Sequence, residues 1–139
     1  MSVTDYVFPD PIVAVRERLL EETAVTNLVS TRILSRTGDP LPSRPFVRLD
    51  LAGGAPVDDR FLDGARIQIH VFHDHESAPA AVTVAQTVRA ALIATRAWVG
   101  DAGKIAGTVI ESGPAIFYDT THTPPLVDVT FSVLVYLRP

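Results

Sequence analysis

Three segments of the chain alternate apolar and polar residues with a period of two, the spacing of a β-strand with one buried face. The segments are residues 46–51, 65–72 and 126–137. The third is the longest, and its apolar positions are Val127, Val129, Phe131, Val133, Val135 and Leu137. We therefore predict three strands, each with one face turned towards a hydrophobic core.

Other segments space their apolar residues by three and four, which predicts amphipathic helices. The first helix is predicted to follow Asp10, a favourable N-cap, with Pro11 at the first helical position, and to end near Leu20. A second, short helix is predicted after it, capped by Thr23.

The longest helix is predicted from about Ser77 to Arg96, a segment whose many alanines favour helix. Its apolar stripe consists of Val84, Val88, Ala91, Leu92 and Thr95. A stripe of this width indicates that the helix packs on the sheet along one side.

Two stretches rich in glycine and proline flank the first alternating segment, and both predict loops. They are Thr37–Pro45 and Ala52–Arg60. Both are long for connections within one domain, so each is either ordinary surface variation or a contact between subunits. Short strands are predicted at residues 32–34, 107–112 and 115–118.

These elements predict an α+β fold over residues 1–139, taken as a single domain. We expect two layers, a mostly antiparallel sheet with helices packed on one face. The other face is predicted to be polar, either solvated or wet at an interface, and not a second hydrophobic core. Its side chains are Arg48, Asp50, Gln68, His70, Phe72, Asp128, Thr130 and Ser132.

The composition narrows the possible functions. The chain has no cysteine, which excludes disulfides, cysteine nucleophiles and thiolate metal sites. Its net charge of -4 lacks the basic excess that tight nucleic-acid binders usually show. The first ten residues do not resemble a signal peptide, and no apolar run reaches the roughly 18 residues of a membrane span. A soluble cytosolic protein with no membrane partner is expected.

The candidate chemistry lies in one cluster, His70, His73, Asp74 and His75, with His122 distant in sequence. These side chains are metal ligands, but their spacing matches no metal motif, so a solvated turn that leads into a helix is the favoured interpretation. The acidic residues Asp58, Asp59 and Asp63 are likewise interpreted as a solvated turn. No catalytic motif is present, and neither an enzyme nor a cofactor is expected.

A series of features follows one order over nearly the whole chain. They are the opening helix, Thr31-Arg32-Ile33 before a proline-rich loop, Pro45-Phe46-Val47 at the start of a strand, Asp63-Gly64-Ala65-Arg66-Ile67-Gln68-Ile69 after a glycine-rich loop, Val88-Arg89-Ala90-Ala91-Leu92 in the long helix, and the alternating strand Val127 to Leu137. In this order the sequence resembles the tail-terminator (tail-completion) family of long-tailed bacteriophages. The segment His73-Asp74-His75 departs from the short acidic or aromatic turn expected there.

The resemblance implies a structural virion protein without catalytic residues. Such proteins form a ring, expected here to be a hexamer, that caps the head-proximal end of the tail tube, stops tube polymerisation and joins the tail to the head. The implied partners are further copies of the chain, the tail tube protein and a head-completion or neck protein. DNA passes through the lumen without specific binding, and assembly takes place in the host cytoplasm.

We predict that ring contacts come from the polar sheet face or from the turn around Asp58, Asp59 and Arg60, because charge and loop length concentrate there. The candidate interface residues are Arg44, Phe46, Arg48, Asp50, Asp58, Asp59 and Arg60. Two alternatives stay open: another virion joint, such as a head-closure or tail-tube protein, and a small metal-dependent enzyme or ligand-binding domain that uses His70, His73 and His75.

Overall fold

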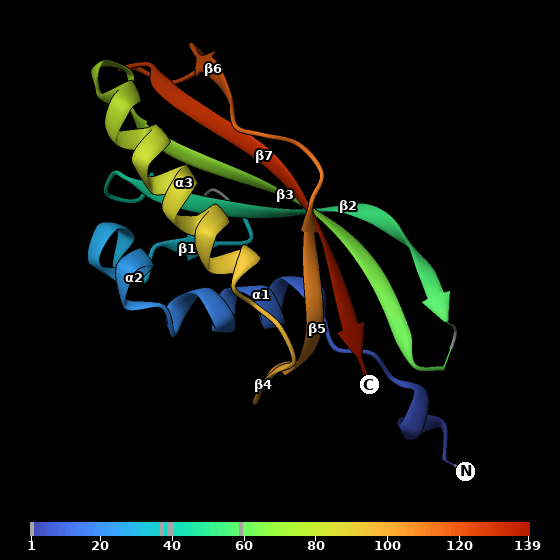
Figure 1. Ribbon diagram of the computed structural model, residues 1–139. Helices are drawn as coiled ribbons and strands as arrows, with labels where there is room; N and C mark the ends of the chain where they lie inside the picture. Colours follow the sequence, from blue (N-terminus) through green and yellow to red (C-terminus); the bar gives the residue numbers. More distant parts are fainter. Residues whose placement is uncertain (1, 37, 39–40, 59) are drawn as a thin grey trace.

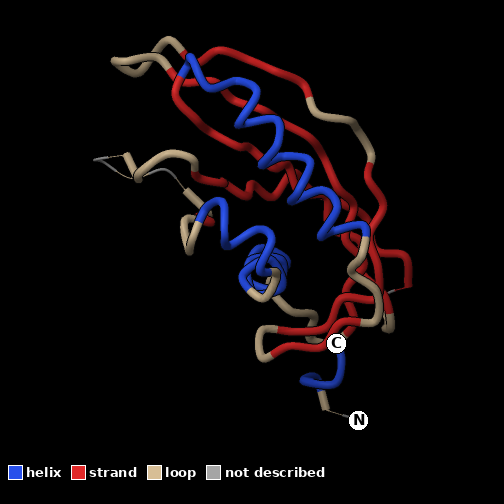
Figure 2. The backbone as a smooth tube through the Cα atoms, turned by 60° about the vertical axis from the view of Figure 1, so that its left-hand side comes forward, coloured by secondary structure: helices blue, strands red, loops and turns tan. Residues whose placement is uncertain are grey.

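The computed structural model describes residues 2–36, 38, 41–58 and 60–139, without the side chains of residues 55 and 56. Its described part has three α-helices, α1 (Pro11–Leu20), α2 (Thr23–Val29) and α3 (Ala78–Ile93), and two short 3-10 turns, η1 (Val3–Tyr6) and η2 (His75–Ser77). The helices lie on one side of a curled sheet (Figures 1 and 2). The predicted α+β architecture is confirmed.

One seven-stranded sheet forms the other layer, within the described residues. Its strands are β1 (Ile33–Leu34), β2 (Phe46–Asp58), β3 (Leu62–Asp74), β4 (Trp98–Gly100), β5 (Gly103–Ile110), β6 (Ala115–Asp119) and β7 (Leu126–Arg138). The order is β1-β2-β3-β7-β5-β4, and β6 pairs with the first half of β7. Only β1 and β2 are parallel; the other pairs are antiparallel.

The main core lies between the helices and one face of β3 and β7. The alternating positions of β7 predicted to be apolar are all buried, as are the stripe residues of α3. Cross-strand pairs such as Ile69 with Phe131 place large side chains from both strands against α3. The periodicity of two therefore predicted the buried face correctly.

Helix α1 starts where its sequence predicts. The Asp10 carboxylate accepts hydrogen bonds from the N–H groups of Ile12 and Val13, at 2.9 and 3.3 Å, and Pro11 occupies the first turn. The prediction for α2 was one residue late, because Thr23 is the first helical residue and the N-cap is Glu22. The carbonyl of Glu22 already accepts from Val25 and Thr26, so the backbone defines this helix start.

Helix α1 also fixes the turn between β4 and β5. The two carboxylate oxygens of Glu17 accept from the backbone N–H groups of Asp101 and Ala102, at 2.8 and 2.6 Å. Trp98 donates its indole N–H to Glu21 at 2.8 Å. The far edge of the sheet is thereby tied to the helix layer.

Among the described residues, no helix combines the length and the apolar character that a transmembrane span requires.

The prediction of a loop at Ala52–Arg60 was wrong over most of its length. Strand β2 continues to Asp58 and pairs with β3, so that the two strands form a hairpin that extends beyond the helices (Figure 1). Gly53 and Gly54 have φ values of 90° and 144°, and the register shifts between Leu51 and Gly54. The glycine pair forms a β-bulge, after which pairing resumes. In the other predicted loop, the described residues 38 and 41–45 are neither helix nor strand, as expected.

The second sheet face is not wholly polar, contrary to the prediction. At one end of the sheet, Phe46, Phe72 and Leu126 form a small buried cluster, covered by Leu34 and Leu41. The rings of Phe46 and Phe72 stack with centroids 5.1 Å apart. Leu41, from the described part of the proline-rich loop, thus packs over this end of the sheet and shields it from water.

Candidate functional site

The centre of the second sheet face holds a hydrogen-bonded polar network around His70. One ring nitrogen lies 3.1 Å from the Asp50 carboxylate and the other lies 3.0 Å from that of Asp128. Thr130 donates to Asp128 at 2.8 Å, and Gln68 adds a contact of 3.2 Å to the imidazole. The side chains of His70 and Asp128 are only 12% and 16% exposed. These groups therefore satisfy one another within the subunit and leave little surface for a ligand.

The predicted interface residues on and beside this face are engaged within the subunit to different degrees. Phe46 is fully buried, so its side chain offers no surface to a partner. Arg48 donates to Asp50 at 3.2 Å and lies over the Phe72 ring, and Arg44 donates to Asp74 at 2.6 Å. The side chains of Arg44, Arg48 and Asp50 are 27%, 27% and 36% exposed, so part of each is accessible.

The histidines are dispersed over different surroundings. His70 belongs to the network above, whereas His73 accepts a hydrogen bond from the Asp74 N–H at 2.7 Å. His75 lies in η2 against Tyr118, with ring centroids 5.0 Å apart. Within the part of the chain that the structure describes, no group of three or more His, Cys, Asp or Glu side chains could hold a metal ion.

The tip of the β2–β3 hairpin carries two of the predicted residues, Asp58 and Arg60; Asp59 lies outside the described residues. The Asp58 carboxylate accepts from the Arg60 N–H at 2.9 Å and its carbonyl accepts from Phe61 at 3.2 Å, which closes a tight turn. The turn leaves the ring of Phe61 68% exposed. Asp63 lies in β3 and not in the turn.

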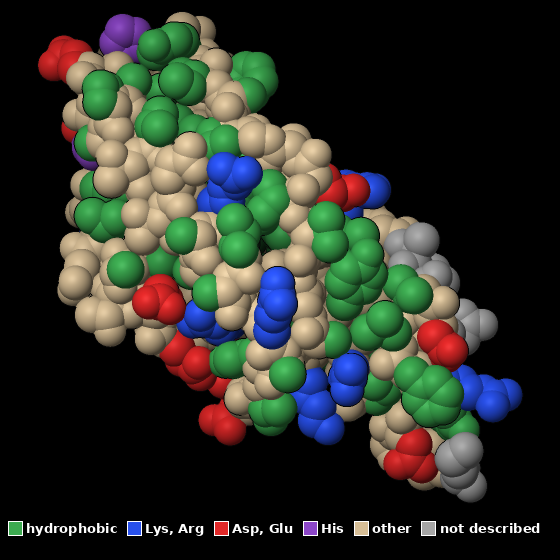
Figure 3. Space-filling view, in the orientation of Figure 1, with side chains coloured by type: hydrophobic (Ala, Val, Ile, Leu, Met, Phe, Trp, Pro, Cys, Tyr) green, Lys and Arg blue, Asp and Glu red, His purple; other side chains and the backbone are tan. Residues whose placement is uncertain are grey.

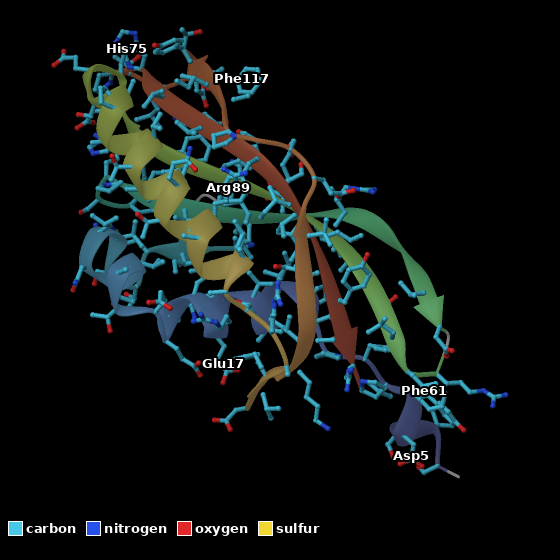
Figure 4. All side chains as sticks on the ribbon, viewed as in Figure 1. Asp5, Glu17, Phe61, His75, Arg89 and Phe117 are labelled. Atoms are coloured by element: carbon cyan, nitrogen blue, oxygen red, sulfur yellow. The ribbon has the colours of Figure 1, made fainter. Side chains whose placement is uncertain are left out.

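The tip borders a groove of about 780 Å³, which we call the tip groove. In Figure 4, Phe61 from the hairpin and Asp5 from the N-terminal turn lie at the same end of the molecule. In Figure 3, hydrophobic, basic and acidic side chains all lie over the projecting end of the molecule that the hairpin and the N-terminal turn form. The groove is lined by Asp5, Tyr6, Asp58, Arg60, Phe61, Leu62, Lys104, Arg138 and Pro139.

A second exposed apolar surface, which the site prediction missed, lies at the opposite end of the sheet. Its residues Ile116, Phe117 and Tyr118 in β6 are 48%, 57% and 55% exposed, and we call them the β6 patch. Figure 4 shows Phe117 beside this strand, far from Phe61. The sequence contained a usable signal, because three consecutive large apolar residues in a strand cannot all face one core. Among the described strands, β6 pairs only with β7, so its outer edge is open.

Two carboxylates, Glu111 directly after β5 and Asp119 at the end of β6, have lowered pKa values. Hydrogen bonds from Arg66, at 2.6 and 3.0 Å, lower the pKa of Glu111, and the charge of Arg66 adds to this effect. The side-chain and backbone hydrogen bonds of Thr121 lower the pKa of Asp119, next to the β6 patch. Both groups are therefore anions at neutral pH.

Comparisons with known proteins agree with these observations. The family model described as tail completion protein gp17 matches residues 13–136. Among solved structures, the chain is similar in fold to a chain of the "Virion of native gene transfer agent (GTA) particle", with 16% sequence identity and a TM-score of 0.68. That match covers 93% of this chain and 95% of the other. No curated protein matches the sequence.

Proposed function

The chain belongs to the tail completion protein gp17 family, and from this membership we propose that it forms a ring on the head-proximal end of a phage-type tail tube. The ring consists of six copies. It stops tube polymerisation and offers its other surface to a head-completion or neck protein. Assembly takes place in the host cytoplasm, and the finished ring is part of the virion. This role is structural and requires no cofactor or catalytic residue.

One observation carries the proposal: a single chain has two different exposed apolar surfaces at opposite ends of its sheet. The tip groove contains Phe61, and the β6 patch contains Phe117 and Tyr118. A closed cyclic ring needs a heterologous contact, in which each copy offers a different surface to each of its two neighbours. Two distinct surfaces on one chain meet that requirement.

The distribution of charge is compatible with a lumen that DNA traverses. The net charge of -4 gives the ring no overall attraction for phosphates, so DNA can pass without being held. The partly exposed side chains of Arg44, Arg48 and Asp50 remain proposed contact residues, as does the hairpin turn with Asp58 and Arg60.

Disruption of the gene tests this function. Particles produced without the protein should contain unjoined heads and tails, with tubes longer than normal, and added purified protein should restore joining. Normal tail length and normal joining in its absence would contradict the proposal. Purified protein that polymerises by itself into long tubes would instead identify a tube protein.

A further inference from the structure

The tip groove has an excess of basic side chains that form no ion pair with the residues that the structure describes. Arg60, Lys104 and Arg138 come from the hairpin turn, β5 and β7, and none of them forms an ion pair with a described acidic residue. The groove also holds two side-chain carboxylates, Asp5 and Asp58, each of which accepts a backbone N–H, from Ser2 at 3.0 Å and from Arg60 at 2.9 Å, and keeps its charge. The groove therefore has three cationic against two anionic side chains around an exposed aromatic ring, and this basic excess suits an acidic and aromatic segment.

The β6 patch has the complementary character. Asp119 directly follows Tyr118 in β6; it accepts hydrogen bonds from Thr121, which lower its pKa, and it lies 3.6 Å from His122. Glu76 lies in η2 next to His75, whose ring contacts Tyr118, and it makes no ion pair with the described residues. The strand with three exposed apolar side chains and an open backbone edge thus ends in one carboxylate, Asp119, and a second, Glu76, adjoins the histidine that packs on it.

We propose that the tip groove of one copy receives the β6 patch of the next copy, so that Phe61 packs against Phe117 and Tyr118 while the basic rim of the groove faces Asp119 and Glu76. This inference rests on the proposed ring, since it names the two surfaces that meet at each subunit contact. The surfaces lie at opposite ends of the sheet (Figure 4), so each copy can bind two neighbours at once. Repetition of this contact either closes a ring or builds an open filament.

The absence of cysteine from the chain allows a direct test by disulfide cross-linking. We would prepare Phe61→Cys and Phe117→Cys, each at a highly exposed position where the change leaves the fold intact. A disulfide forms only where the two Cα atoms come within about 7 Å. Each substitution also removes an aromatic ring from the proposed contact, so the variants are mixed with an oxidant well above the concentration at which the original chain assembles. The two single variants should then give a mixed dimer as the main product, and the double variant should give a linked series up to the closed ring.

Val13→Cys provides the matched control, because Val13 is 51% exposed but lies in α1, outside both surfaces. Mixed with either test variant, it should give no specific dimer. Mass measurement of the same samples shows whether rings form, and so tests the proposed ring separately from the proposed docking surfaces. Rings that form without a link between positions 61 and 117, or with equal linkage to position 13, would overturn the docking surfaces and leave the ring in place. If neither rings nor cross-links form, with or without tail tubes, both the ring and the docking surfaces are overturned.

Discussion

Replacement of Phe61 by alanine should weaken assembly without weakening the fold. Phe61 is 68% exposed in the single subunit, so its truncation removes almost no contact from the hydrophobic core. Full burial of a phenylalanine side chain is worth about 1.5–3 kcal/mol, and the exposed two-thirds of Phe61 therefore makes about 1–2 kcal/mol available at each contact between copies. Since 1.4 kcal/mol corresponds to a factor of ten, each contact should weaken by about 5- to 30-fold.

Analytical ultracentrifugation over a range of concentrations measures this effect, and thermal unfolding of the same samples measures the fold. Because all contacts of a closed ring change together, the concentration at half-assembly should rise at least as much as for one contact. Val13→Ala, an exposed apolar truncation on α1, is the matched control and should assemble as the original chain does. If Phe61→Ala assembles at the original concentration, Phe61 makes no contact between copies and the reasoning from its exposure is wrong.

Three further changes test other parts of the structure. Asp10→Ala removes the acceptor of two N–H groups at the start of α1 and should cost about 1 kcal/mol, seen as a lower melting temperature. Glu111→Gln should reduce the loss of stability in acid, measured as urea midpoints between pH 6 and 3. The pKa of Glu111 is lowered by Arg66, so the pair stabilises the fold above the ordinary value of 4.5 and this contribution is lost as the pH falls through the lowered pKa. Gly54→Ala places a Cβ against the carbonyl oxygen of Gly64 at a positive φ, and it should loosen the hairpin, seen as faster amide exchange, and weaken assembly.

Each of these changes has an informative control. Asp10→Asn retains an N-cap acceptor and should keep most of the stability. Arg66→Gln should give the same shallower acid response as Glu111→Gln, and an unchanged response in both would show that the pair does not contribute. Gly113→Ala adds a Cβ in open space, so it should change neither amide exchange nor assembly. If Gly54→Ala and Gly113→Ala have equal effects, the β-bulge at Gly54 does not depend on glycine.

The sequence predicted the elements whose pattern is determined by burial on one face. Strand β7 and helix α3 each place every predicted apolar residue in the core, and Asp10 with Pro11 marks the start of α1. In these segments, the local pattern and the tertiary environment impose the same period. The prediction therefore needed no knowledge of partner strands.

The extended hairpin could not be predicted in the same way. Gly53-Gly54 is typical of a loop and equally typical of a β-bulge, and the choice depends on whether a partner strand continues alongside. Here Ala65 pairs with Gly54, so β2 continues. The buried state of Phe46 likewise depends on Leu41, which reaches the sheet from a loop with no periodic pattern.

The candidate interface residues stay a prediction. Charge and loop length led to Asp58 and Arg60, which the structure places at an exposed tip. The basic rim of the tip groove was not predicted, since Lys104 and Arg138 reach it from strands distant in sequence. Strand pairing in the sheet brings these residues together, and no local sequence pattern indicates which strands pair.

Electron cryomicroscopy of tail tubes incubated with the purified protein tests the central claim most directly. Ring formation predicts sixfold density at one end of each tube, with the hairpin tip of every copy against β6 of its neighbour, and six copies of the 15.0 kDa chain in each cap. Tubes with bare ends, or with the protein bound along their whole length, would contradict it.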